Sequence, residues 1–220
     1  DTDVLSASEA DDKIISYENK TIHRNAAFPA ASTISTSVAG PWSIVTGDID
    51  ADGDLDVVSA SYNDDRISWQ ENNGASPPGW TTRTISITAD GAQDVAVADV
   101  DGDGDLDVLS ASGNDDKIAW YENNGASPPV WTTRVISTSA DGAYSVAAAD
   151  LDGDGDVDVL SAAQYDGNVV WYENTGGSPP AWTARQMSTG DPRHSFAIAD
   201  LDGDGDNDVL TATIGSGYIV

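Results

Sequence analysis

The sequence predicts an all-β fold built from repeated units of about 50 residues, and three regularly spaced markers carry this prediction. The first is an aspartate-rich motif that reads DIDADGDLD, DVDGDGDLD, DLDGDGDVD and DLDGDGDND and begins at Asp48, Asp99, Asp150 and Asp200. The second is WQEN or WYEN, which starts at Trp69, Trp120 and Trp171. The third is Pro-Pro-X-Trp, which ends at Trp80, Trp131 and Trp182. Three markers in one register indicate a tandem repeat.

Within a unit, apolar and polar residues alternate with a period of two. In the third complete unit we expect strands at 145–151, 158–163, 168–174 and 182–188, because these runs are rich in Val, Ala, Thr and aromatic residues. Gly, Pro, Asn and Asp separate them, as is typical of strand ends. No stretch has the apolar spacing of an amphipathic helix. Each unit is therefore predicted to contain four strands.

Four short antiparallel strands at this repeat length are typical of a β-propeller blade. A single blade cannot bury both of its faces, so neighbouring blades stack. We expect complete blades at 39–88, 89–139 and 140–189, and partial blades at 1–38 and 190–220. DTDVLSAS begins at the seventh position of the aspartate motif and GYIV stops before the expected Trp, so we expect a fragment of a larger propeller.

Composition limits the possible partners. The chain has 220 residues with 38 acidic and 9 basic side chains, a formal net charge of −29. This charge excludes nucleic acid, which is bound through Lys and Arg. No apolar run approaches the about 20 residues of a membrane span, so we expect no membrane insertion. The absence of cysteine excludes disulfides, thiolate metal sites and cysteine nucleophiles. Cations are the natural partners.

The aspartate motifs have the pattern of an oxygen cage for a hard cation. Ca²⁺ takes 6–8 oxygen ligands in flexible geometry, whereas Mg²⁺ prefers a strict octahedron and keeps its waters. Side chains at positions 1, 3, 5 and 9 and the carbonyl at position 7 would surround one ion, with the position-7 side chain toward solvent. Gly104 and its equivalents supply the sharp turn. A merely solvated acidic surface would scatter Asp and Glu instead of alternating Asp strictly.

We therefore expect about four Ca²⁺ ions. Their ligand residues are Asp48, Asp50, Asp52, Asp54 and Asp56; Asp99, Asp101, Asp103, Asp105 and Asp107; Asp150, Asp152, Asp154, Asp156 and Asp158; and Asp200, Asp202, Asp204, Asp206 and Asp208.

These residues also carry a family resemblance. GAYSVAAADLDGDGDVDVL, residues 142–160, resembles the FG-GAP repeat of integrin α-subunit propellers and, more strongly, the bacterial VCBS-type version. The resemblance implies a calcium-binding propeller of about seven blades, with ions in the loop between the first two strands of each blade. Ser-Ala-Ser at 110–112 and Ser-Ala-Ala at 161–163 replace the Gly-Ala-Pro of the repeat's name. Adhesive contacts of the family are therefore not carried over.

One position breaks the uniformity of the repeats and is our candidate for ligand binding. At the start of the first strand the equivalent residues are Trp42, Gln93, Tyr144 and His194. Variation on a repeated scaffold can individualise a binding surface; neutral drift at an exposed site is the alternative. The tryptophans of the WQEN and WYEN motifs are expected to be structural. Those after the Ser-Pro-Pro loops are expected to be more exposed, where stacking on sugars is a second possibility.

Catalysis has little support. The two histidines, His23 and His194, lie in different units, and no hydrolase or phosphate-binding motif is present. Identical Asp sets do not provide the two unlike carboxylates of a glycosidase. We expect a non-enzyme: a calcium-stabilised binding or adhesion module of a secreted, extracellular or cell-surface protein, bacterial in origin, with a protein or glycan ligand. The alternatives are a lectin-like propeller and an accessory domain of a secreted polysaccharide-degrading enzyme.

Overall fold

A computed structural model describes residues 3–18, 31–189 and 193–213, and these ranges contain strands and loops without a helix. The three complete sheets each have four antiparallel strands. They are β4 (Pro41–Gly47), β5 (Asp56–Ser61), β6 (Arg66–Asn72) and β7 (Trp80–Ser86); β8 (Ala92–Ala98), β9 (Asp107–Ser112), β10 (Lys117–Asn123) and β11 (Trp131–Ser137); and β12 (Ala143–Ala149), β13 (Asp158–Ala163), β14 (Val169–Asn174) and β15 (Trp182–Ser188).

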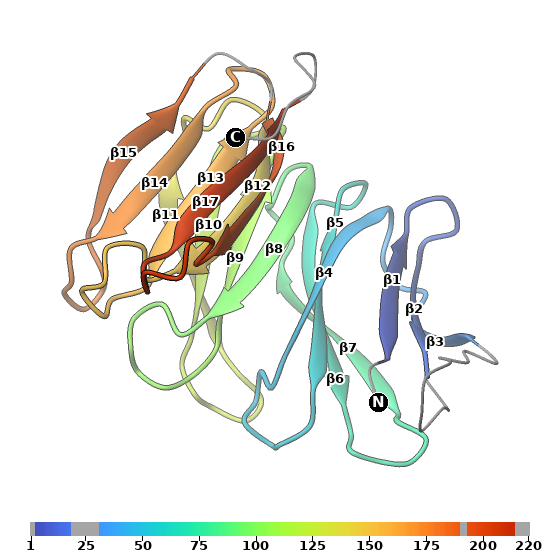
Figure 1. Ribbon diagram of the computed structural model, residues 1–220. Helices are drawn as coiled ribbons and strands as arrows, with labels where there is room; N and C mark the ends of the chain where they lie inside the picture. The colour runs from blue at the N-terminus through green and yellow to red at the C-terminus, as the bar shows by residue number, and fades with distance from the viewer. Residues whose placement is uncertain (1–2, 19–30, 190–192, 214–220) are drawn as a thin grey trace.

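A three-stranded sheet precedes these sheets and a two-stranded sheet follows them. The first consists of β1 (Val4–Ser8), β2 (Lys13–Tyr17) and β3 (Ala31–Ser35), and the second of β16 (Arg193–Ala199) and β17 (Asp208–Thr213). Within every sheet, consecutive strands pair as neighbours, and the sheets succeed one another like blades of a fan (Figure 1). The predicted all-β propeller architecture is confirmed. The strand expected near the C-terminus, at 217–220, lies outside the described residues.

The first strand of a blade, here called the inner strand, begins two residues earlier than the alternation of apolar and polar residues predicts. In the third complete unit the first strand covers Ala143–Ala149 instead of 145–151, and Asp150 and Leu151 already belong to the loop. Ala143 pairs with Ala163 and Ser145 with Ala162, so the strand continues across one unpaired residue. Such a bulge shifts the period-two pattern by one position, which hid the first two residues of the strand.

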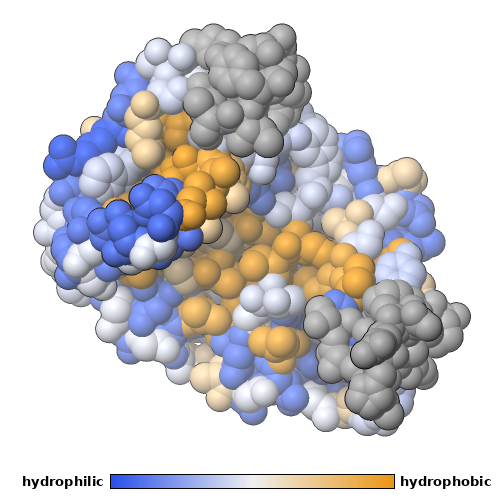
Figure 2. Space-filling model, viewed as in Figure 1, coloured by the Kyte–Doolittle hydropathy of each residue, from blue (hydrophilic) through white to orange (hydrophobic). Residues whose placement is uncertain are grey.

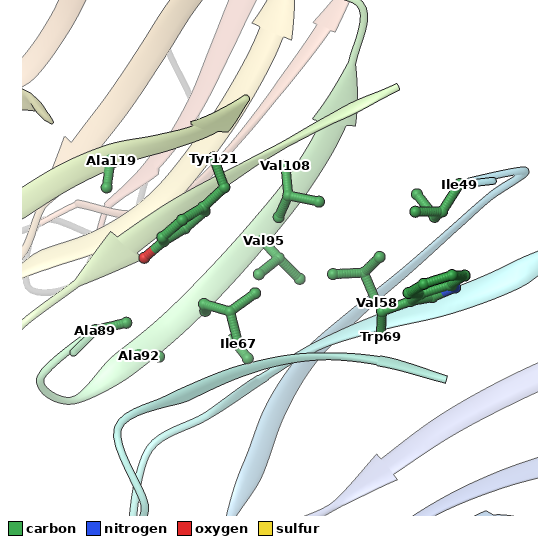
Figure 3. Close-up of a cluster of buried hydrophobic side chains, with 11 residues drawn as sticks. Ile49, Val58, Ile67, Trp69, Ala89, Ala92, Val95, Val108, Ala119 and Tyr121 are labelled. Atoms are coloured by element: carbon green, nitrogen blue, oxygen red, sulfur yellow. The ribbon is translucent and has the colours of Figure 1, made fainter. Parts of the chain in front are cut away.

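The hydrophobic core lies between adjacent sheets. One cluster joins Val58, Ile67 and Trp69 of one sheet to Val95 and Tyr121 of the next (Figure 3). Trp120 occupies the position of Trp69 in the following interface. Both indoles are buried, so the prediction that they are structural is confirmed. Figure 2 shows apolar side chains in a band across the middle of the molecule, bordered by hydrophilic surface.

Trp171 and the three tryptophans of the Pro-Pro-X-Trp marker are half-buried. Trp171 packs beside Phe196 and Ile198 of the two-stranded sheet. Trp80, Trp131 and Trp182, expected to be more exposed, lie at the edges of the hydrophobic clusters. Their position favours packing over a sugar platform.

A hydrogen bond from a glycine amide to a turn aspartate connects neighbouring blades at the end where the inner strands begin. Asp65, in the turn between β5 and β6, accepts a 2.9 Å hydrogen bond at Oδ1 from the Gly91 amide of the next blade. The same bond joins Asp116 to Gly142 at 2.9 Å. Asp65 has a φ of 56° and Asp116 the same, in the left-handed region that Asp tolerates better than most residues. Sequence and backbone conformation thus repeat together with the inter-blade contact.

Candidate functional site

The four aspartate motifs form the loops that join each inner strand to the second strand of its blade. In the second complete blade the loop starts at Asp99, directly after β8, and ends at Asp107, the first residue of β9. Carboxylate oxygens of Asp99, Asp101 and Asp103 lie within 4.8 Å of one another. The equivalent groups are Asp48, Asp50 and Asp52; Asp150, Asp152 and Asp158; and Asp200, Asp202 and Asp208. Positions 1, 3 and 5 meet in the first two loops, and positions 1, 3 and 9 meet in the last two.

Several of these oxygens are buried without a hydrogen-bond donor. Among the described residues, Oδ1 of Asp50, Asp99 and Asp101 has no partner. Burial, with repulsion from Asp103, raises the pKa of Asp101, and burial with repulsion from Asp52 raises that of Asp50. Buried acceptors and charges are normally paired, or they coordinate a metal. A divalent cation would supply the missing counter-charge, and a donor set made of oxygen atoms suits Ca²⁺.

The backbone of the loop is wrapped around its first aspartate. Asp48 accepts hydrogen bonds from the amides of Asp52 and Gly53, both at 3.0 Å. Gly104 has a φ of 96° and supplies the expected turn. Position 4 also has positive φ, and there the first loop carries Ala51 at 57° where the second carries Gly102 at 74°. These hydrogen bonds and positive φ angles therefore account for the turn, and the turn brings the carboxylates together.

In the three complete blades, the aspartate at position 9 is the most buried of the loop and also makes backbone contacts. Asp107 accepts hydrogen bonds from the amides of Val100 at 3.1 Å and Asn123 at 2.7 Å. Burial raises its pKa to about 7, against these two bonds and a weaker contact with the Trp120 indole. The indole N–H itself makes no well-formed hydrogen bond. Asp56 and Asp158 make the same pair of amide contacts, so position 9 ties the loop to the third strand.

The position-7 side chains do not all point to solvent as expected. Asp54 and Asp105 are half-buried and lie against Gly74 and Gly125, where a Cβ would come within 2.1 and 2.2 Å of their Oδ2 atoms. Gly74 and Gly125 both have a φ of 65°, in the left-handed region that favours glycine, and the nearby carboxylate leaves little room for a side chain. Asp156 and Asp206 are exposed.

The predicted ligand-binding position coincides with the bulge of each inner strand. Pro41 pairs with Ser61 and Ser43 with Ala60, which leaves Trp42 unpaired. Gln93, Tyr144 and His194 are bypassed in the same way. A bulge re-aims side chains and is over-represented beside functional sites. The side chain of His194 lies outside the described part of the structure.

The bulges open onto one pocket of about 210 Å³. Its lining residues are Trp42, Ser43, Gln93, Asp94, Tyr144, Ser145 and Ser195. The sequence pattern identified the bulged residues but not the residues that follow them. The available signal was that this next position is Ser in three units and Asp in one. Asp48 follows Trp42 by six positions of extended chain, about 20 Å at about 3.3 Å per residue. The pocket and the aspartate loops therefore lie at opposite ends of the inner strands.

Comparison with known families decides the identity of the repeats. The model of the FG-GAP-like repeat matches residues 1–59, 48–110, 99–161 and 150–211, nearly the whole chain. The chain belongs to the FG-GAP-like repeat family. The resemblance inferred from residues 142–160 is thereby confirmed. No curated protein sequence matches the chain.

Solved structures share the fold of these FG-GAP repeats. A lectin of Agrocybe aegerita that recognises non-reducing terminal N-acetylglucosamine has a TM-score of 0.60 at 20% identity, over 95% of this chain and 57% of its own. A protein of unknown function from Desulfotomaculum acetoxidans has a TM-score of 0.62 at 12% identity, over 99% and 64%. The Vibrio cholerae biofilm matrix protein Bap1 has a TM-score of 0.55 at 21% identity, over 95% and 34%.

The chain thus spans between about a third and two thirds of the length of these structures. At these identities the likeness establishes the fold. Within the described ranges, the chain forms no helix that is long and apolar enough to cross a membrane.

Proposed function

We propose that this chain is a calcium-bound, non-catalytic module that binds a glycan outside the cell. The observation that carries the calcium part is the carboxylate cluster in each aspartate loop, with buried oxygens that lack a donor in the first two loops. Four Ca²⁺ ions carry eight positive charges and would change the formal charge from −29 to −21. Because the ions bind only the folded loops, their binding free energy adds to folding stability.

Two considerations support a glycan ligand and an extracellular location. The described fold is shared with a lectin and with a biofilm matrix protein. Calcium sites of extracellular modules have dissociation constants of about 10⁻⁴–10⁻³ M, a range matched to extracellular calcium. The carboxylates repeat the same contacts in each loop, which favours a structural over a catalytic use.

The calcium part is tested by titration and thermal unfolding. Isothermal titration of EDTA-treated protein should give close to four Ca²⁺ per chain, and the melting temperature should rise with calcium concentration. By linkage, a site at tenfold excess of calcium over its dissociation constant adds about 1.4 kcal/mol. An unchanged melting temperature on addition of EDTA, or an equal effect of Mg²⁺, would contradict the calcium proposal.

The glycan part is tested separately, on a glycan array probed with calcium-loaded protein and repeated in EDTA. Binding to a defined set of glycans supports a lectin-like module. If no glycan is retained while an extracellular protein ligand is, the module is a protein-binding adhesin.

A further inference from the structure

At the start of β4, β8 and β12, two successive residues of the same strand line one pocket. In a regular strand, neighbouring side chains point to opposite faces. Here Trp42 and Ser43, Gln93 and Asp94, and Tyr144 and Ser145 all line one cavity. The bulge at the first residue of each pair makes this possible. β4, β8 and β12 lie side by side (Figure 1), so three complete blades build the pocket, and Ser195 of β16 adds a residue from the next blade.

Two aromatic rings form a corner of the pocket. Trp42 meets Tyr144 edge to face, with ring centroids 6.3 Å apart at an interplanar angle of 68°. The indole is stacked on Tyr62 at 4.9 Å and 18°. The Tyr62 hydroxyl in turn donates to Asn114 Oδ1 at 3.1 Å. Although it is 40% exposed, Trp42 is thus held in one orientation before any ligand arrives.

The Asp94 carboxylate accepts hydrogen bonds from serine hydroxyls of the blades on both sides. Asp94 Oδ1 accepts from Ser43 Oγ at 2.6 Å, and Oδ2 accepts from Ser145 Oγ at 2.9 Å. The amides of Val95 and Val146, both at 3.0 Å, complete four hydrogen bonds. All four donors are uncharged. Since the two serines give their hydrogens to Asp94, their oxygens remain as acceptors toward the pocket.

Gln93 adds an acceptor that nothing in the described structure satisfies. Its side chain is 9% exposed, and Oε1 is buried without a donor. The amide nitrogen lies over Gly113, where a Cβ would come within 2.1 Å of Nε2. A buried polar group without a partner is unusual in a folded protein. Here it lines the same cavity as the aromatic corner.

We propose that this pocket binds one non-acidic pyranose unit of a glycan, an inference that rests on the proposed function. The exposed Trp42 surface takes the apolar face of the ring. Hydroxyl groups of the sugar donate to the serine oxygens, and to Gln93 Oε1 once its amide group turns from its buried position toward the cavity. A cavity of about 210 Å³ is below the about 300–1,000 Å³ of pockets for drug-sized ligands, so it fits a single small unit. An acidic sugar would meet acceptors and the Asp94 charge without a donor.

The inference is tested with methyl glycosides of glucose, galactose, mannose and N-acetylglucosamine, titrated into calcium-loaded protein by calorimetry. Methyl glucuronide is the acidic match for the glucoside, and methyl glucosaminide is its basic match. We expect at least one neutral glycoside to bind and the acidic sugar to bind at least tenfold more weakly than its neutral match. Equal binding of the acidic sugar, or binding of glucosamine without any neutral sugar, overturns the inference.

Variants separate this pocket from other sites. Trp42→Ala and Gln93→Leu should each weaken binding of the neutral sugar at least fivefold. Tyr165→Ala removes an exposed aromatic ring that does not line the pocket, and it should leave binding within twofold. Melting curves in calcium verify that each variant is folded. If the wild-type chain binds glycans while Trp42→Ala and Gln93→Leu bind equally well, the inference fails and the glycan proposal stands. If the wild-type chain binds no glycan, both fail.

Discussion

The side chain of Asn123 donates a 3.0 Å hydrogen bond to the carbonyl of Ile49, 74 residues earlier in the chain. Ile49 is the second residue of the aspartate loop in the preceding blade, and Asn123 ends the third strand of its own. The same side chain donates to Leu106 O at 3.1 Å within its own loop. Asn174 repeats the arrangement with Val100 and Val157. Each asparagine therefore joins two neighbouring aspartate loops.

Asn123→Ala should lower the free energy of unfolding by about 2–3 kcal/mol, because it leaves two carbonyls without a donor in a buried site. Asn72 is the matched control. Its amide contacts Leu55 O at 3.1 Å in its own blade, at an exposed position. Asn72→Ala should therefore cost about 1 kcal/mol or less. Urea denaturation in calcium measures both, and equal losses would show that the inter-blade bond contributes nothing.

Asp101→Ala should destabilise the calcium-bound chain but not the calcium-free chain. Burial and repulsion raise the pKa of Asp101 in the empty loop, so removal of the charge should leave the EDTA-treated protein equally stable or up to about 1 kcal/mol more stable. With calcium, the loss of a ligand should lower stability by about 1–3 kcal/mol. The measurement is the melting temperature in the two buffers.

Asp105→Ala is the control for this test, because the Asp105 side chain lies against Gly125 and only its carbonyl is expected to face the ion. It should keep the calcium stoichiometry of the wild type in calorimetry, whereas Asp101→Ala should lose close to one ion. If both variants keep all ions, the assignment of position 3 as a ligand is wrong.

Ala51→Gly should stabilise the chain by up to about 1 kcal/mol, because Ala51 has a φ of 57° that costs an L-residue about 1–2 kcal/mol. Gly102→Ala is the reverse experiment at the equivalent position and should destabilise by about 1 kcal/mol. No atom lies within 4 Å of a Cβ built on Gly102, so backbone conformation alone is being tested. Differential scanning calorimetry of the pair decides; a stabilised Gly102→Ala would contradict the conformational argument.

Asp65→Ala should cost about 2–3 kcal/mol, since it leaves the Gly91 amide without its acceptor and puts alanine at positive φ. Asp65→Asn keeps an acceptor oxygen and a residue that tolerates this conformation, so its cost should stay below about 1 kcal/mol. Hydrogen exchange of the Gly91 amide provides a local readout. Exchange should accelerate in the alanine variant and stay slow in the asparagine variant.

The fold and the aspartate loops could be predicted because their signals are local. The position of Asp99, Asp101 and Asp103 at alternate residues brings their oxygens together through the backbone turn alone. The packing of Asp105 against Gly125 was not predictable in the same way. It depends on where a loop 20 residues later returns, which composition and spacing do not specify.

The pocket was likewise predictable only in part from the sequence. The variable position of Trp42 and Gln93 was visible in the aligned repeats, but the bulge that exposes it was not. One unpaired residue shifts the apolar alternation by one position, and no particular residue type marks where it does so. The contact of Asp94 with Ser43 and Ser145 joins residues 51 apart on each side, so it depends on the angle between blades.

Asp94 has a consequence for the order of the repeats. Its equivalents in the other units are Ser43, Ser145 and Ser195, so one acceptor stands among donors. Packing surfaces and loops are nearly interchangeable from blade to blade, yet an Asp-bearing blade needs a Ser-bearing blade on both sides. Ser145 and Ser195 already lie in neighbouring blades, so the constraint falls on the Asp-bearing blade: beside a blade that lacks this serine, Asp94 would lose one hydroxyl donor. A single side chain, Asp94, therefore constrains which blades can lie beside it, although the repeats are otherwise nearly identical.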